Sequence, residues 1–184
     1  CVLSYFSLGR YNIDIPQTET HHKRVTELKG LKYILRRQLM INQFHRQKIS
    51  EKYGIDNPEV IAELENRGLL VSLKREEVNQ LLGRTDMPSG ALKIVYPNSP
   101  EIYTIRSDMP FAPDTTKKPQ RYFKPAGQPN RLYIPYRFEN IEHMSEIWVL
   151  EGEMKALCGA ILGLPTVAVS GIWCWRGDDQ SEAS

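Results

Sequence analysis

The stretch EIWVLEGEMKALCGAILGLPTVAVSG, residues 146–171, decides the fold of this 184-residue chain. It opens with an apolar run at 146–150 and continues with a helical pattern over 154–162. A Gly-Leu-Pro turn then leads to a β-branched run at 166–169. A near-continuous apolar strand on each side of a helix is typical of a buried parallel sheet. We therefore expect a βαβ unit here, with both strands buried.

Glu151 directly follows the first strand of this unit, at the carboxyl edge where α/β sheets bind ligands. The next residue, Gly152, lets the backbone come close to a phosphate or a metal because it has no Cβ. Glu153 and Lys155 are expected in a solvent-facing first helical turn, where an acid also complements the helix dipole. Two interpretations stay open: Glu151 binds a ligand, or the two acids merely start the helix.

The preceding sequence predicts helices and then short strands. We expect one helix from Pro58 to Gly68 and another through Leu82, capped by Ser72. A β-hairpin is predicted from strands at 92–96 and 102–106, followed by a loop over 107–130 and a short strand at 132–134. The expected divisions are a basic helical lead-in (1–45), a small helical subdomain (46–87), a β-rich lead (88–138) and the α/β part (139–184).

Positive charge is concentrated in residues 23–52, which carry nine Lys or Arg against two Glu, a net charge of +7. Apolar residues spaced by three and four predict one amphipathic helix over 21–52, with Gly30 as a weak point. The basic face of such a helix either contacts nucleic-acid phosphates or only keeps the helix solvated. The candidate nucleic-acid-binding residues are Arg36, Arg37, Arg46 and Lys48 here, and Arg106, Arg121, Lys124 and Arg131 in the β-rich lead.

Composition excludes several classes of protein. No apolar run approaches the roughly 20 residues that span a bilayer, so a membrane protein is not expected. Cys1, Cys158 and Cys174 form no CxxC pair, which argues against a disulfide scaffold and a zinc site and favours the cytoplasm. The four histidines have no metal-ligand spacing and are expected at the surface. The chain starts without Met, which suggests a fragment or a processed product.

Several segments resemble a known family. Residues 148–156, WVLEGEMKA, resemble the first motif of the Toprim fold of primases, topoisomerases and related nucleases. With the turn at 163–165 and the stretch GIWCWRG at 171–177, they are similar to the DUF3854 family of Toprim-like domains in plasmid, phage and mobile-element replication proteins. The likeness covers about residues 46–177, and Met154 replaces a usual Lys. The motif residues without an assigned reaction are Gly152, Glu153, Gly171, Trp173 and Trp175.

The resemblance implies an α+β lead followed by the first βαβ unit of an α/β, Rossmann-like Toprim fold that is truncated at its C-terminus. It implies Glu151 as the acid/base or metal-bridging carboxylate and Lys155 as a phosphate contact. Mg²⁺ would be the cofactor, held mainly by an Asp-x-Asp motif that this chain does not reach, so the metal would bind weakly here. Trp173 and Trp175 either fill the core or stack on bases.

The implied function is Mg²⁺-dependent nucleotidyl transfer on DNA by a primase-like replication protein. Its expected partners are single-stranded DNA, nucleotides and a helicase domain or subunit. One alternative is a catalytically idle nucleic-acid-binding module attached to a helicase. A nuclease of the overcoming-lysogenisation-defect type is a further alternative.

Overall fold

The computed structural model describes residues 40–112, 116, 118–138 and 140–170. All of them belong to one compact unit, residues 37–184. The elements of this unit, in chain order, are α2 (Gln43–Tyr53), α3 (Pro58–Asn66), β1 (Leu70–Leu73), α4 (Arg75–Leu82), β2 (Ala91–Tyr96), β3 (Ser99–Phe111), β4 (Gln120–Phe123), the 3₁₀ helix η1 (Ile141–His143), β5 (Trp148–Glu151), α5 (Glu153–Ile161) and β6 (Thr166–Val169). The unit is therefore mixed α/β.

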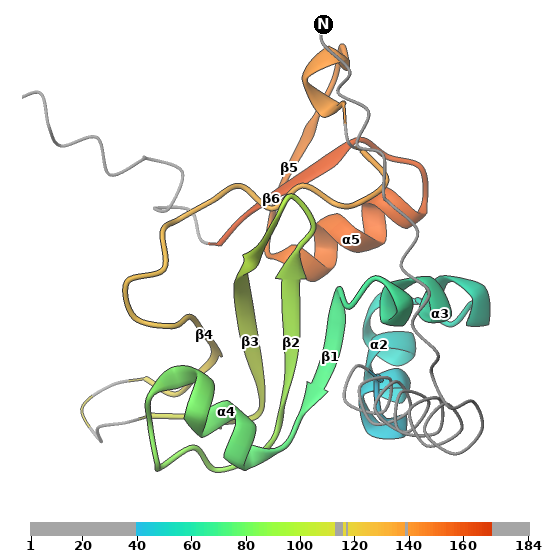
Figure 1. The fold of residues 1–184 in the computed structure, drawn as a ribbon. Helices are drawn as coiled ribbons and strands as arrows, with labels where there is room; N and C mark the ends of the chain where they lie inside the picture. The colour runs from blue at the N-terminus through green and yellow to red at the C-terminus, as the bar shows by residue number, and fades with distance from the viewer. Residues whose placement is uncertain (1–39, 113–115, 117, 139, 171–184) are drawn as a thin grey trace, which may run out of the picture. The chain divides into compact units, whose positions relative to one another are not determined.

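Strands β1 to β4 form an antiparallel sheet in that order. Figure 1 shows α2 and α3 beside β1, α4 at one end of the sheet, and α5 with β5 and β6 at the other. The predicted hairpin is confirmed as β2 and β3, whose register pairs Leu92 with Arg106 and Ile94 with Thr104. Strand β4 falls inside the stretch that was expected to be a loop, where Arg106 pairs with Tyr122.

The expected cap at Ser72 is wrong. Ser72 lies in β1 and pairs with Leu92 of β2, and the helix that follows starts after Lys74. The apolar pair Leu70 and Val71 is buried against the sheet, so this segment gains more from strand pairing than from extending a helix. Segment 46–87 thus contributes an edge strand to the main sheet as well as helices.

Strands β5 and β6 form a separate parallel pair, with α5 between them in sequence, as the strand–helix–strand pattern predicted. The expected burial of both strands is correct only for β6. Trp148 and Val149 of β5 are 57% and 64% exposed. The reason lies in the pairing: β6 is flanked by β5 and by a bridge from Ala168 to Tyr133, whereas β5 pairs only with β6 in the described part of the chain. The expected strand at 132–134 is reduced to that single bridge.

Helix α2 begins later than the sequence predicted, because Asn42 caps it by accepting a hydrogen bond from the His45 N–H at 2.8 Å. The rest of the expected basic helix, before residue 40, lies outside the described residues. The helix ends at Gly54, whose φ of 67° is in the left-handed region that suits glycine. Lys52 and Tyr53 therefore sit at its carboxyl end.

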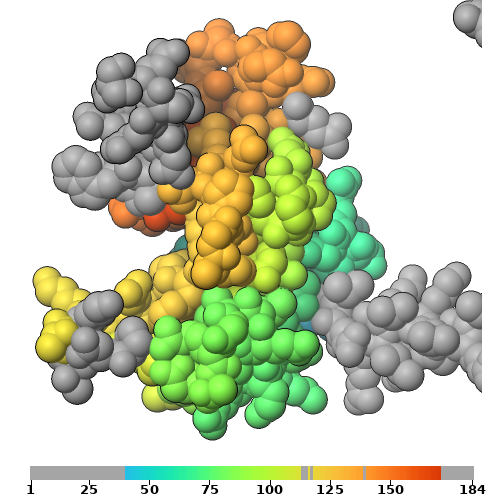
Figure 2. Space-filling view, turned by 60° about the vertical axis from the view of Figure 1, so that its left-hand side comes forward, coloured from blue at the N-terminus to red at the C-terminus, as the bar shows by residue number. Residues whose placement is uncertain are grey.

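One apolar core joins the sheet to the parallel unit. Its buried members come from α2, α3, β1, β2 and α5, and include Ile49, Leu64, Ile94 and Leu157. A smaller cluster around Val78, Met87 and Ile105 holds α4 against the sheet. In the space-filling view of Figure 2, the amber segment that follows β4 runs up the face between green α4 and the orange region around 140–150.

Candidate functional site

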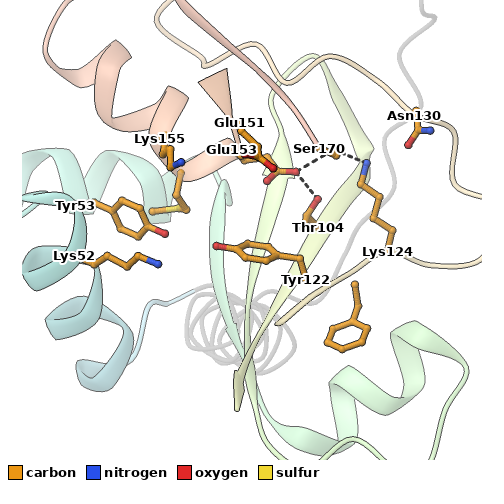
Figure 3. Close-up of a pocket in the computed structure, with 13 residues that line it drawn as sticks. Lys52, Tyr53, Thr104, Tyr122, Lys124, Asn130, Glu151, Glu153, Lys155 and Ser170 are labelled. Atoms are coloured by element: carbon orange, nitrogen blue, oxygen red, sulfur yellow. Dashed lines mark hydrogen bonds between the residues drawn. The ribbon is translucent and has the colours of Figure 1, made fainter. Parts of the chain in front are cut away.

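A pocket of about 460 Å³ opens where the end of α2, the sheet and the start of α5 meet. It is lined by Lys52, Tyr53, Thr104, Tyr122, Phe123, Lys124, Asn130, Glu151, Gly152, Glu153, Met154, Lys155 and Ser170. Figure 3 shows Lys52 and Tyr53 reaching in from α2, opposite Tyr122 on β4. We call it the tyrosine pocket. The carboxyl edge of β5, which the sequence singled out, forms one of its walls.

Glu153 is buried on the inner side of this pocket, at only 3% exposure. Its Oε1 accepts hydrogen bonds from the hydroxyls of Tyr96 at 2.8 Å and Thr104 at 2.7 Å, and more weakly from Ser170 at 3.5 Å. The expectation of a solvent-facing Glu153 is therefore wrong. The first turn of α5 lies against the end of β2 and the middle of β3, and the hydroxyls of Tyr96 and Thr104 replace the water that an exposed carboxylate would bind.

Tyr96 is fixed as the donor in this network. Burial raises the pKa of its hydroxyl, and the negative charge of Glu153 raises it further. The Tyr96 proton therefore stays in place at any physiological pH. Ser170 also accepts a hydrogen bond from Nζ of Lys124 at 2.8 Å, which holds this lysine at the pocket (Figure 3). Lys124, a nucleic-acid-binding candidate from the sequence, thus lines this pocket, and its role stays a prediction.

Glu151 and Lys155 lie at the rim and are both exposed. Glu151 ends β5, and Lys155 follows on the first turn of α5. Gly152 between them has a φ of 93°, a conformation that residues with a Cβ rarely adopt, and this turn carries the chain from strand to helix. Glu151 and Lys155, the two candidate catalytic residues, therefore share the pocket with Glu153, whose buried carboxylate lies on its inner side.

A second pocket adjoins the first. It is lined by Lys48, Glu51, Lys52, Arg106 and Arg121, and it shares Lys52 with the tyrosine pocket. The two pockets are also linked through Tyr122 of the tyrosine pocket, which pairs across the sheet with Arg106 of the second pocket. Three residues that the sequence proposed for nucleic acid, Lys48, Arg106 and Arg121, are thus brought together. We call this the basic pocket.

Other candidates lie elsewhere. Arg46 forms an ion pair with Glu65, with 2.6 Å between its Nη2 and Oε1, and also donates to the carbonyl of Ile41, so it holds α2 to α3. Arg131 is exposed and lines neither pocket. The remaining candidates lie outside the described residues: Arg36, Arg37, Gly171, Trp173 and Trp175.

His45 corrects the expectation that the histidines are surface residues. It is 1% exposed, and its ring nitrogens lie 2.6 Å from the Ser72 hydroxyl and 2.7 Å from a carboxylate oxygen of Asp108. These contacts join α2 to β1 and β3. His143 is exposed as expected, and the other two histidines are outside the described residues.

Comparisons with family models, curated proteins and solved structures find no match. Within the described ranges, no three His, Cys, Asp or Glu side chains gather closely enough to hold a metal ion. In the same ranges, no helix has the length and apolar character to cross a membrane.

Several pocket residues escaped the sequence analysis, among them Lys52, Tyr53, Thr104 and Tyr122. The available signal was their chemistry: a Lys-Tyr pair just before the terminating Gly54, and an Arg-Tyr-Phe run within a polar stretch. Neither signal could place them opposite each other, because α2 and β4 are about 70 residues apart in sequence.

Proposed function

We propose that the chain binds single-stranded nucleic acid, with DNA as the expected form, as part of a primase-like replication protein. The observation that carries the proposal is the convergence of tyrosine rings and lysines in the tyrosine pocket. Proteins that bind single strands combine cationic side chains that follow the phosphates with aromatic rings on which bases stack. Tyr122 is 44% exposed, so its ring offers a face to a base.

The charges around the ring support this interpretation. Lys52, Lys124 and Lys155 line the pocket against two carboxylates, and one of these, Glu153, is held by neutral hydroxyls in the interior. The part of the pocket that faces solvent therefore favours anions. The basic pocket next to it extends the positive surface beyond Tyr122.

The proposal is tested by fluorescence anisotropy with a labelled twelve-nucleotide oligo-dT. Tyr122→Ala should weaken binding by about tenfold, while Tyr122→Phe should retain most of it because the ring is kept. Lys124→Gln should weaken binding and reduce its salt dependence. The matched control is Lys118→Gln, an exposed lysine outside both pockets. If Tyr122→Ala and Lys124→Gln both bind as the wild type does, the tyrosine pocket is not the binding site.

Nucleotidyl transfer is the second candidate, favoured by the position of Glu151 at the carboxyl edge of β5 beside Lys155. The described residues do not by themselves fit Mg²⁺. Of the two carboxylates in the pocket, Glu153 is taken up by Tyr96 and Thr104, and a single exposed carboxylate among lysines is a poor donor set for a hard cation. The role proposed for Glu151 is to transfer a proton or to position a substrate.

A further inference from the structure

Positive charge in the basic pocket exceeds the negative charge that surrounds it. Four cationic side chains line it with one carboxylate, that of Glu51. Asp108 lies close enough to favour the charged form of Lys48, but one of its carboxylate oxygens contacts Nε2 of His45 at 2.7 Å. Arg121 donates to the Asp108 main-chain carbonyl at 2.9 Å, not to a carboxylate. The pocket is therefore suited to an anion.

Arg106 gives the independent evidence for a ligand. It is only 7% exposed, and its Nε has no hydrogen-bond partner among the described residues. Buried arginines are normally paired, since an unsatisfied buried donor costs stability. The planar guanidinium fork matches the oxygens of a phosphate. Because Arg106 lines the basic pocket, a phosphate bound there lies beside a guanidinium that lacks an acceptor at Nε.

Lys48 supports the same conclusion. Burial lowers the pKa of its ammonium group, and the charges of Arg106 and Arg121 lower it further against the opposing effect of Asp108. The centroid of the Phe44 ring lies 3.9 Å from Nζ of Lys48. An anion would relieve the repulsion among these cations.

We propose that Lys48, Arg106 and Arg121 form a phosphate seat, which holds one phosphodiester of a strand whose base stacks on Tyr122. This proposal rests on the proposed function and adds to it a defined binding position for one phosphate of the strand. The seat and the ring are neighbours, because Lys52 lines both pockets and Tyr122 pairs with Arg106 in the β3–β4 register. A phosphate and an adjacent base follow each other along any single strand.

The test is a scan of the twelve-nucleotide oligo-dT in which one linkage at a time is a neutral methylphosphonate. With the strand held in one register by a 5′ hairpin, one linkage should cost the wild type about tenfold in affinity. The same linkage should cost Arg121→Gln nothing further. Arg121 is partly exposed, so its replacement should leave the fold intact. Arg106→Lys, which keeps the charge but loses the fork, should give an intermediate result.

The control is Arg75→Gln, an exposed arginine at the start of α4 outside both pockets, which should keep the full linkage effect. If the linkage effect persists in Arg121→Gln, or no linkage matters, the seat is wrong while strand binding stands. A separate titration with inorganic phosphate, followed by thermal unfolding, covers the other case. Stabilisation that depends on Arg121 without any binding of DNA would support the seat and overturn the proposed function. No response to either probe overturns both.

Discussion

The hydroxyl of Tyr96 donates a 2.8 Å hydrogen bond to Oε1 of Glu153, a residue 57 positions further along the chain. Thr104 donates to the same oxygen. This buried carboxylate thereby joins the end of β2 and the middle of β3 to the first turn of α5. Since α5 carries Lys155 and follows Glu151, the carboxylate also fixes one wall of the tyrosine pocket.

Glu153→Ala should destabilise the fold by about 3 kcal/mol, because it leaves two buried hydroxyl donors without their acceptor. Glu153→Gln should cost about 1 kcal/mol, since it keeps one acceptor oxygen. Urea unfolding gives both values. Combining Glu153→Ala with Tyr96→Phe should cost clearly less than the sum of the two single changes. Strict additivity would show that the hydrogen bond contributes nothing to stability.

Glu151→Gln should leave stability within about 0.5 kcal/mol of the wild type, because the side chain is exposed. If Glu151 moves a proton, primer synthesis by the whole protein should fall by roughly 10²–10⁴-fold. The matched control is Glu101→Gln, an exposed glutamate on β3 outside both pockets. Full activity of Glu151→Gln in a primer-extension assay would remove the residue from the chemistry.

Arg46 and Lys48 are two residues apart on α2, and we expect opposite effects from their replacement. Arg46→Gln should lower stability by about 1 kcal/mol through the lost Glu65 pair, with oligo-dT affinity unchanged. Lys48→Gln should leave stability nearly unchanged and weaken affinity, with the salt slope reduced by about 1. Urea unfolding and anisotropy on both variants check this. The reverse pattern would contradict the assignment of both residues.

Acid should destabilise the contact between Tyr136 and Glu63. The Tyr136 hydroxyl donates to Glu63 at 2.8 Å, and this hydrogen bond holds the pKa of the carboxyl below its ordinary value of 4.5, helped by Arg67 and Arg137. A lowered folded-state pKa stabilises the protein above pH 4.5, and this stabilisation is lost as the pH falls through the lowered value. Tyr136→Phe should cost about 1 kcal/mol at pH 7 and less at pH 3. An equal cost at both pH values in urea unfolding would contradict this.

Gly159 of α5 leaves no room for a side chain. A Cβ there would lie 2.6 Å from Cγ2 of Thr166 on β6, which is fully buried. Gly159→Ala should therefore destabilise the protein by about 1–3 kcal/mol despite the better helix propensity of alanine. Thr166→Ser removes Cγ2 but keeps the hydroxyl that donates to the Ala156 carbonyl. In thermal unfolding, adding Thr166→Ser should recover part of the loss. No recovery would place the strain elsewhere.

The local patterns in the sequence were sufficient to predict much of the fold. The hairpin of β2 and β3 and the order β5, α5, β6 followed from periodicity and turn residues, because both depend on neighbours in sequence. The exposure of β5 could not be predicted, since an apolar run indicates a strand but not how many partner strands it has. Strand β4 was missed because its four residues depend on pairing with β3.

The site was predicted less completely. Glu151, Lys155 and Lys124 could be found from strand ends and charge, and all three line one pocket. The roles of Glu153 and His45 could not be found, because their hydrogen-bond partners Thr104 and Asp108 are about 50 and 63 residues away. Long-range pairing decides whether a polar residue faces solvent or the interior, and a single sequence does not contain that pairing.

We expect the parts of the tyrosine pocket to meet late in folding, because they are far apart in sequence. Its walls come from α2, β4 and α5, and Cys158 of α5 contacts the Tyr53 carbonyl across 105 residues of chain. The β2–β3 hairpin closes a far shorter loop and should form early. A ligand of the pocket therefore binds only the fully folded chain. It should slow unfolding while leaving the refolding rate nearly unchanged, because the early hairpin contributes Thr104 alone to the lining of the pocket.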